Sequence, residues 1–297
     1  MMTSFPRAGQ ARPYFEGWYL KQQNGRETLA LIPAYHVDQA GAASASLQVV
    51  ADSQAYTIPF PGSAFSIDRQ QRRLRLGDCL FSPAGCQVAA RWEDCCLEGA
   101  LRFGPLNPPA YDIMGPFCLA PFLECRHSVF SLLHGVEGCL TVNGKQFRFE
   151  NGPGYWEGDR GVSFPKRYIW TQCSWGHNSI MLSVAEIPFG PFSFVGCVGF
   201  IFFNGKERRI ATYRGVKLLQ LQDDAVLLRQ GRLVLQIQML AAKNQLLPAP
   251  EQGRMSRAIR ESLSCPVRYA CRVGGIPLFD FVSEQASFEN NWQVAAV

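Results

Sequence analysis

The sequence predicts an all-β protein of two barrel-like or sandwich-like units, with one short helix near the C-terminus. Short apolar runs separated by turn residues are dense along the chain, and helical periodicity is scarce. The length of 297 residues suits two domains of about 150 residues each. A hydrophobic fraction of 47% with 18% charged residues supports a sizeable core and excludes a disordered chain.

The strand candidates begin in the first third of the chain. Five short runs there have the spacing of a β-meander: 47–50, 64–67, 72–76, 87–92 and 97–103. Asn143-Gly144 and Asn204-Gly205 each separate two apolar alternating runs, and Asn-Gly there predicts a hairpin because both residues tolerate positive φ. A further strand is expected at Leu233 to Met239, after the turn at Gln230-Gly231.

The expected helix is Met255 to Leu263. Met255, Ile259 and Leu263 recur at every fourth position, as on one face of a helix. Pro266 closes this segment, because proline removes a backbone donor and does not fit a helix interior. Residues 267–273 then form another strand candidate.

A short internal echo favours two related β units. Tyr14-Phe15-Glu16-Gly17 returns about half a chain length later as Tyr155-Trp156-Glu157-Gly158, and each copy precedes an aromatic-rich run. We place the division between residues 1–118 and 119–297, near the turn-rich stretch from Gly115 to Pro121. The prediction is therefore an N-terminal and a C-terminal barrel-like domain.

Charge and apolar patterning exclude several classes of protein. A net charge of +5 is mild, and the basic clusters at Arg69–Arg75 and Lys206–Arg209 are explained as charged strand edges, so we expect no nucleic-acid partner. The most apolar stretch, 187–203, contains prolines and glycines, so we expect no membrane span, while transient contact with a membrane surface stays open. The first 13 residues lack an apolar signal-peptide core, which predicts a cytoplasmic location.

The eleven cysteines are expected to be reduced thiols, mostly in the core. Their number is odd, no Cys-x-x-Cys pair occurs, and Cys95-Cys96 is a vicinal pair that seldom forms a disulfide. A zinc site is the alternative, but these spacings fit none of the usual ligand patterns: Cys79/Cys86, Cys118/Cys125 and Cys265/Cys271. We therefore expect no metal and no organic cofactor.

Three segments contain residues that could carry chemistry. The first, Tyr14 to Lys21, places Glu16 among aromatic residues, where a carboxylate is costly to bury unless it is paired or protonated. Two explanations stay open for Glu16. It either forms an ion pair with a nearby Arg or Lys beneath a floor of aromatic side chains, or it contacts a ligand.

The second segment is Pro121 to His127, followed by His134. Strand alternation places Cys125 and His127 on one face, with Glu124 on the other. His134 lies an odd number of residues from His127, so the two share a face only if a bulge or a turn intervenes. Each histidine could move a proton at neutral pH or could simply be hydrogen bonded within the fold.

The third segment, Gly152 to Cys173, crowds carboxylates and cations beside tryptophans. Its glycines imply a tight loop, but no strand–loop–helix context surrounds them, so a phosphate cradle is not indicated. Burial would raise the pKa of Glu157 or Asp159, whereas a neighbouring cation would lower it. A salt-bridged loop that closes a barrel mouth is the structural alternative to a functional site.

These three segments, in this order, resemble the tocopherol cyclase family. The motif Tyr-x-Glu-Gly-Trp-Tyr is found at Tyr14 to Tyr19, and Glu-Cys-x-His at Glu124 to His127. The block Gly-x-Gly-Tyr-x-Glu-x-Asp-x-Gly-x-Ser-Phe-Pro is found at Gly152 to Pro165, and an aromatic strand ending in Gln at Tyr168 to Gln172. The resemblance covers most of the chain and implies two lipocalin-like β units that hold an apolar ligand.

The reaction that the resemblance implies is the acid-initiated cyclisation or hydration of a prenylated quinol or isoprenoid. Asp159 or Glu157 would protonate the alkene, and His127 or His134 would accept a proton. The other ligand-contacting residues are aromatic or polar and come from the first and third segments: Glu16, Trp18, Tyr19, Tyr155, Trp156, Lys166, Trp170 and Gln172.

The chain departs from the family pattern at two places. Arg160 stands where a Trp commonly follows the Asp, and a cation there favours an ionised Asp159, which is a weaker proton donor. Ser174-Trp175 stands where Asn-His often follows Gln172. A non-catalytic carrier or sensor of a lipid, quinone or isoprenoid is therefore the alternative function, and a β-rich interaction protein with filled barrels is a third. The oligomeric state stays open.

Overall fold

The computed structural model describes residues 13–51, 54–68, 70–71, 73–120, 123–243 and 245–292. Nearly all of this part of the chain is β-strand, as predicted, with three short 3-10 turns. It divides into two compact units, and neither is continuous in sequence. The first unit contains the described residues up to Tyr111 together with Glu124–Phe164 and Pro248–Arg257, and the second contains the remainder. We predicted that residues 1–118 and 119–297 form two domains, and the position of that boundary stays a prediction.

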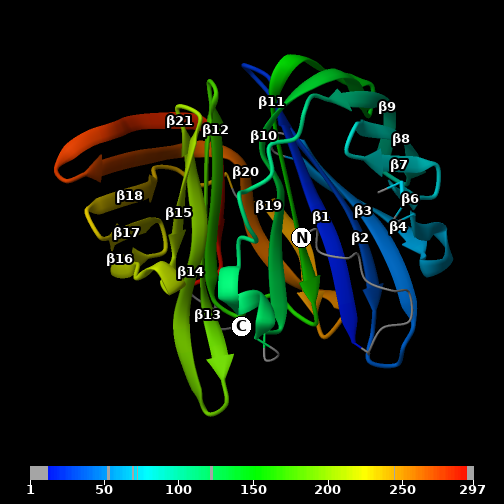
Figure 1. The fold of residues 1–297 in the computed structure, drawn as a ribbon. Coiled ribbons are helices and arrows are strands. Elements are labelled where there is room, and N and C mark those ends of the chain that lie inside the picture. The colour runs from blue at the N-terminus through cyan, green and yellow to red at the C-terminus, as the bar shows by residue number, and fades with distance from the viewer. Residues whose placement is uncertain are drawn as a thin grey trace. The chain divides into compact units, whose positions relative to one another are not determined.

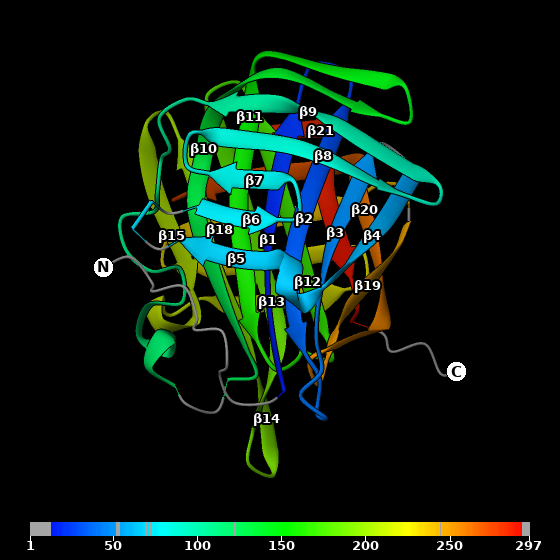
Figure 2. The same cartoon turned by 90° about the vertical axis from the view of Figure 1, so that its right-hand side faces the viewer.

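The first unit is an antiparallel sheet of 11 strands in the order β4-β3-β2-β1-β11-β10-β9-β8-β7-β6-β5 (Figures 1 and 2). Its strands are β1 (Tyr14–Gln23), β2 (Thr28–Val37), β3 (Ala43–Ala51), β4 (Gln54–Pro61), β5 (Phe65–Asp68), β6 (Arg73–Leu76), β7 (Cys79–Ser82), β8 (Gly85–Trp92), β9 (Cys95–Phe103), β10 (Cys125–Val142) and β11 (Lys145–Gly161), with the 3-10 turn η1 (Gly62–Ala64) before β5. In Figure 2, β5 to β9 cross in front of β1 to β3, so the sheet curls over its own core.

The second sheet has 10 strands in the order β15-β14-β13-β12-β21-β20-β18-β17-β16, with β19 paired to β20. It belongs to the second unit except for residues 248–251 of β19 and 254–257 of β20, which belong to the first. Its strands are β12 (Tyr168–Trp175), β13 (Asn178–Phe189), β14 (Phe192–Phe203), β15 (Lys206–Ala211), β16 (Lys217–Gln222), β17 (Ala225–Gln230), β18 (Leu233–Met239), β19 (Gln245–Glu251), β20 (Arg254–Val273) and β21 (Ile276–Asn290). The 3-10 turns η2 (Gly115–Leu119) and η3 (Thr212–Arg214) accompany this sheet.

Each unit has its own apolar core. The first core gathers residues from nearly every strand of its sheet, with Trp18, Leu20 and Trp156 among them. The second core is built around β12, β13, β18, β20 and β21 and includes Ile169 and Tyr269. These cores fix the strand faces, because a one-residue slip would turn every buried side chain outward.

The two Asn-Gly hairpins are confirmed. Asn143 and Gly144 have φ of 50° and 83° between β10 and β11, and Asn204 and Gly205 have φ of 50° and 72° between β14 and β15. The strand predicted at Leu233 to Met239 coincides with β18. Four of the five predicted meander strands lie at β3, β5, β8 and β9, and the fifth, residues 72–76, overlaps β6 except for residue 72, which lies outside the described residues.

The predicted helix at Met255 to Leu263 is wrong, because this segment lies within β20. A spacing of four residues is a multiple of two, so Met255, Ile259 and Leu263 also lie on one face of a strand. The residues between them, Arg257 and Glu261, are half-buried or buried as well, which is the period of two that a strand requires. The four-residue recurrence alone did not distinguish the two structures.

The predicted barrels are not closed. In the described part of the chain, the first sheet runs from β4 at one edge to β5 at the other, and these two strands do not pair with each other. β4 does approach β8 and β9, which encloses the core without completing a barrel. The structure is therefore a strongly curved open sheet in this unit. No described helix is long and apolar enough to cross a membrane.

Candidate active site

The centre of the candidate site is formed by three neighbouring strands of the first unit. β11 lies between β1 and β10, and the register places Gly17, Asp159 and His127 in one row across the sheet. Glu157 is in the next row, opposite Tyr19 on β1. Because side chains alternate along a strand, Glu157, Asp159 and His127 share one sheet face. Trp18 and Trp156, one residue out of phase, point to the opposite face and join the first core.

His127 lies between two carboxylates. Its Nδ1 is 3.0 Å from Oδ1 of Asp159, and its Nε2 is 3.2 Å from Oε2 of Glu157. Burial disfavours the charged imidazolium, but the charges and hydrogen bonds of Glu157 and Asp159 outweigh burial and raise the pKa of His127 well above 6.5. His127 is therefore a protonated imidazolium at neutral pH that bridges the two acids.

Tyr155 extends this chain of contacts away from His127. Its hydroxyl donates to Oε2 of Glu157 at 2.5 Å. Burial and the nearby Glu157 charge raise the pKa of Tyr155 well above 10, so the hydroxyl keeps its proton. Cys125 lies at the other end, where its thiol donates to Oδ1 of Asp159 at 3.5 Å, and burial followed by the Asp159 charge raises the pKa of that thiol. The prediction that Cys125 and His127 share a strand face is confirmed by their common contact with Asp159.

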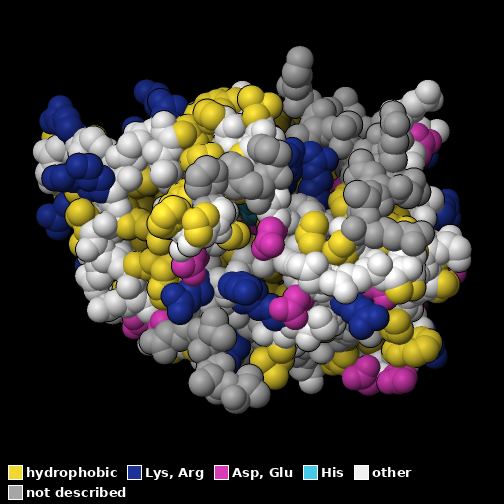
Figure 3. Space-filling model, turned by 90° about the horizontal axis from the view of Figure 1, so that it is seen from below, with side chains coloured by type: hydrophobic (Ala, Val, Ile, Leu, Met, Phe, Trp, Pro, Cys, Tyr) yellow, Lys and Arg dark blue, Asp and Glu magenta, His cyan; other side chains and the backbone are white. Residues whose placement is uncertain are grey.

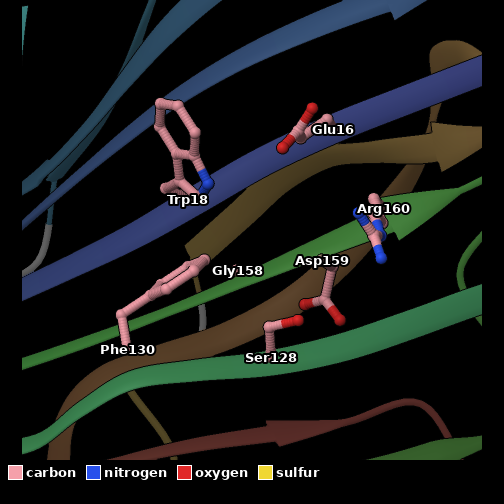
Figure 4. A pocket seen from close by; sticks show the side chains of 7 residues that line it. All are labelled: Glu16, Trp18, Ser128, Phe130, Gly158, Asp159 and Arg160. Atoms are coloured by element: carbon pink, nitrogen blue, oxygen red, sulfur yellow. The ribbon is translucent and has the colours of Figure 1, made fainter. Parts of the chain in front are cut away.

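The members of this cluster differ in their access to solvent. The side chains of His127 and Glu157 are 10% and 6% exposed, whereas that of Asp159 is 24% exposed. Asp159 also lines a pocket whose other walls come from the same three strands: Glu16, Trp18, Ser128, Phe130, Gly158 and Arg160 (Figure 4). Asp159 is thus the most accessible of these three side chains, and its residue also borders the pocket although alternation places its carboxylate on the His127 face.

The pocket is small and mixed in character. Its enclosed space is about 10 Å³, room for about one water molecule and far below the roughly 300 Å³ of a pocket that encloses a drug-sized ligand. Trp18 and Phe130 give it an aromatic wall, while Glu16 and Arg160 add charge of both signs.

Glu16 is held by a local contact. The hydroxyl of Tyr14 donates to its Oε2 at 3.1 Å, and the residue is 6% exposed. The register places Glu16 opposite Arg160 on β11. Glu16 therefore belongs to the pocket side of the sheet, as does Trp18, and both of the explanations considered for Glu16 stay open.

His134 lies away from the cluster. Shifts in the β10–β11 register after Val129 separate it from His127, and its Nδ1 is 3.0 Å from the hydroxyl of Ser131. Its ring packs on Phe103 at a centroid distance of 4.7 Å. Burial lowers the pKa of His134 to about 4, so it is neutral at physiological pH. Its contacts are those of a structural core histidine, and its predicted catalytic role stays a prediction without support from this arrangement.

Three of the predicted ligand-binding residues lie in the second unit. Lys166 is exposed in the loop before β12, and Trp170 and Gln172 are buried on β12. The Gln172 amide donates to the hydroxyl of Ser174 at 3.0 Å. The structure thus brings Tyr19, Tyr155, Glu157, Asp159 and His127 into one unit and places these three in the other.

The predicted site lacked four residues of the pocket wall: Ser128, Phe130, Gly158 and Arg160. Ser128 directly follows His127 on β10, so alternation along the predicted strand offered a signal that Ser128 faces away from His127. Phe130 follows from no such rule, because the register between Val129 and Ser131 shifts. An irregularity of this kind depends on packing that the local sequence does not specify.

The ligand atoms of His127, Glu157 and Asp159 lie within 4.8 Å of one another. One imidazole and two carboxylates are a donor set that can hold a divalent cation. In this geometry, however, the imidazolium already occupies the position between the carboxylates and balances their charge. A metal bound by this cluster would displace the proton on His127.

The site falls within a segment that matches a known family. The model of the family described as tocopherol cyclase-like matches residues 127–187, which include His127, Glu157 and Asp159. The chain resembles the tocopherol cyclases. Two plant proteins align with it at 30% identity over 86 residues: one from Oryza sativa subsp. japonica named "Probable tocopherol cyclase, chloroplastic", and the chloroplastic tocopherol cyclase of Zea mays.

The tocopherol cyclase-like match is partial. The aligned residues make up 29% of this chain and 18% of each plant protein, so the match spans about a fifth of the length of these relatives. The family model includes the His127 cluster and none of the 126 residues that precede His127. The motif predicted at Tyr14 to Tyr19 is therefore supported by its position beside the cluster and not by the family model.

Two solved structures share the fold over nearly the whole chain. A protein assigned as AttH from Nitrosomonas europaea superposes with a TM-score of 0.53 at 11% identity, covering 95% of this chain and 93% of that one. The kievitone hydratase of Nectria haematococca superposes with a TM-score of 0.50 at 10% identity, covering 94% and 89%. Identities this low establish the common all-β, two-unit fold and nothing about the reaction.

Proposed function

We propose that this protein is a cyclase-type or hydratase-type enzyme that protonates an isolated alkene of a prenylated phenol, quinol or isoprenoid. The observation that carries the proposal is the buried arrangement of an imidazolium between two carboxylates, one of which is partly exposed to solvent and belongs to a residue that borders an aromatic-walled pocket. The tocopherol cyclase-like match across this cluster and the hydratase among the proteins of the same fold support the same reaction class.

Asp159 is the proton donor in this mechanism. Its side chain is more accessible than those of His127 and Glu157, and its Oδ1 lies 3.0 Å from Nδ1 of His127, which holds a proton at neutral pH. Transfer of that proton to Asp159 makes a carboxylic acid at the pocket, and transfer onward to the alkene returns the carboxylate. Glu157 keeps the histidine oriented through Nε2, and Tyr155 keeps Glu157 in place.

Protonation of the alkene leaves a tertiary carbocation, which the aromatic faces of Trp18 and Phe130 stabilise on the pocket wall. Capture by the substrate's own hydroxyl closes a ring and gives an isomer, whereas capture by water gives an alcohol heavier by one water. In both cases the oxygen nucleophile loses one proton, which restores the cluster. The reaction needs no oxidant and no organic cofactor.

The test is turnover of a panel of prenylated phenols and quinols in D₂O. We expect one deuteron to be incorporated at the protonated carbon, with an isomeric product for cyclisation or a hydrated product for hydration. Asp159→Asn should lower kcat by about a hundredfold or more, since general acid catalysis contributes about 10² to 10⁴. His36→Gln is the matched control, because His36 is also buried in this sheet but bonds to Ser46 outside the cluster.

Retention of full turnover by Asp159→Asn would refute the assignment of the acid. Tight binding of panel compounds without any product, equally by wild type and Asp159→Asn, would instead indicate the carrier or sensor function. Thermal melting of both variants separates a loss of chemistry from a loss of folding.

A further inference from the structure

We infer that the tip of the β13–β14 hairpin, together with the η2 segment, is a docking surface for a lipid bilayer. The argument concerns the second unit alone and does not depend on the reaction proposed above. β13 pairs with β12 only as far as Ala185, and β14 pairs with β15 only as far as Val198. Beyond those points the two strands pair only with each other, out to Phe189 and Phe192. Figure 1 shows this hairpin projecting past the neighbouring strands.

The projecting part is apolar in a place where hairpins are usually polar. No charged residue occurs between Glu186 and Lys206. Phe192 is 74% exposed and Val195 is 39% exposed. Leaving a phenylalanine in water forgoes the stabilisation of its burial, and an exposed apolar patch of this kind marks an interaction site. The tip therefore has a partner.

The register makes one face of the tip the more apolar. Ile187 lies opposite Phe194, and Phe194 alternates with Phe192 on the same face, while Pro188 and Ser193 lie on the other. The ring of Phe194 is 6.3 Å from that of Phe117 in η2. The patch thus extends from the hairpin onto η2.

Two residues after Phe117, Leu119 is the most exposed large apolar residue of the described chain, at 83%. Exposed cations adjoin both parts of this surface. Arg167 lies beside the base of the hairpin, where its backbone oxygen accepts from the amide of Glu186, and Lys166 precedes it in the chain. Arg214 directly follows Tyr213, whose ring packs on Phe117 at 5.9 Å.

One acidic residue, Glu186, lies beside the base of the hairpin. Its Oε2 is 3.8 Å from Nε of Arg167, which balances its charge. Figure 3 looks onto this end of the hairpin, and on its left side apolar surface lies next to Lys and Arg side chains. Apolar tips flanked by cations suit an anionic lipid surface, where the cations contact headgroups and the aromatic rings enter the interface.

A bilayer fits this surface better than a protein partner does. From Glu186 to Phe189 the strand rises about 10 Å, at about 3.3 Å per residue, which lies within the roughly 5–10 Å that peripheral elements enter a bilayer. A narrow two-stranded tip offers little area, whereas a specific protein interface buries about 800 Å² on each partner. The geometry favours insertion over side-to-side docking.

The test is co-sedimentation of the full-length protein with vesicles of phosphatidylcholine alone and of phosphatidylcholine mixed equally with phosphatidylglycerol. Binding should be stronger to the mixed vesicles and should weaken with salt. Phe192→Ser and Leu119→Ser should each lower the partition coefficient by about tenfold, the factor expected for losing one buried apolar side chain. Ile276→Ser is the matched control, because Ile276 is 72% exposed on a different hairpin of the same unit.

Hydrogen exchange of the wild-type protein gives a second readout that needs no variant. Amides of residues 186–195 should gain protection on mixed vesicles, and those of the β20–β21 turn should not. Absence of vesicle binding at low salt would overturn the inference, as would an equal loss of binding in Phe192→Ser and Ile276→Ser. If sedimentation velocity shows a dimer that Phe192→Ser converts to a monomer, with no change in vesicle binding, the surface joins two copies of the chain instead.

Discussion

His134→Gln should make the protein less sensitive to acid. The His134 side chain is buried against Phe103 and bonds to Ser131, and burial lowers its pKa from 6.5 to about 4. The native state therefore keeps the ring neutral between these values, while the unfolded chain takes up a proton. The unfolded state binds more protons throughout this window, so stability rises with pH there and is lost as pH falls from 6.5 towards 4.

The magnitude follows from the two pKa values. At pH 5, protonation stabilises the unfolded chain by about 2 kcal/mol and the native state by less than about 0.1 kcal/mol. At pH 7, protonation stabilises the unfolded chain by only about 0.2 kcal/mol. His134 therefore lowers the unfolding free energy of the wild type by about 1.8 kcal/mol between pH 7 and pH 5. His36, with a pKa also lowered to about 4 by burial, should add a similar loss.

The assay is urea unfolding of wild type and His134→Gln at pH 7 and pH 5. The quantity to compare is the loss of unfolding free energy between the two pH values, which should be about 1.8 kcal/mol smaller in the variant. His127 contributes equally to both proteins, because its raised pKa keeps it protonated in the native state at both pH values. An identical loss in the two proteins would refute the reasoning, since it would mean that His134 is protonated in the native state at pH 5.

Two further substitutions test the packing around the cluster. Gly158→Ala should lower stability by about 1–3 kcal/mol, because a Cβ there would lie 2.5 Å from Cδ1 of Trp18; a melting temperature equal to that of Gly25→Ala, where nothing lies within 4 Å, would contradict this. Tyr155→Phe should cost about 1.5–3 kcal/mol by removing the donor to the buried Glu157, and urea unfolding at neutral pH measures it; an unchanged midpoint would mean that another donor replaces the hydroxyl.

The fold class and the tight turns could be predicted because they depend on local chemistry. Alternating apolar residues specify strands, and Asn-Gly specifies a turn with positive φ, as at Asn143 and Asn204. The segment from Met255 to Leu263 could not be assigned in the same way. Its four-residue recurrence fits both a helix and a strand, and pairing with β21, far along the chain, decides between them.

The candidate site could be predicted in part. His127, Glu157 and Asp159 were each identified from their residue types, and Cys125 was placed with His127 by alternation. The sequence did not show that His127 sits between two acids, because that depends on β10 and β11 pairing in one particular register. Nor did it show that β1 lies on the other side of β11, a pairing between segments separated by most of the first unit. Non-local register of this kind is fixed by the burial of whole strand faces.

The echo between Tyr14-Phe15-Glu16-Gly17 and Tyr155-Trp156-Glu157-Gly158 has a different origin from the one that the sequence suggested. Both copies lie in the first unit, on the adjacent antiparallel strands β1 and β11, so the echo does not mark two equivalent units. In each copy the tyrosine hydroxyl donates to the glutamate two residues later, at 3.1 Å in the first and 2.5 Å in the second. Residues two positions apart lie on the same face of a strand, so the tyrosine hydroxyl can reach the carboxylate. The motif is therefore a local arrangement that holds a buried carboxylate in place.

The two copies serve opposite faces of one sheet. Tyr19 lies opposite Glu157, and Arg160 lies opposite Glu16, so the two glutamates are out of phase by one residue. One carboxylate is therefore held on the pocket side, and the other contacts His127 on the far side. Asp159 connects the two environments, because it bonds to His127 and also reaches the pocket. In the proposed mechanism, a proton held at His127 reaches the pocket through Asp159.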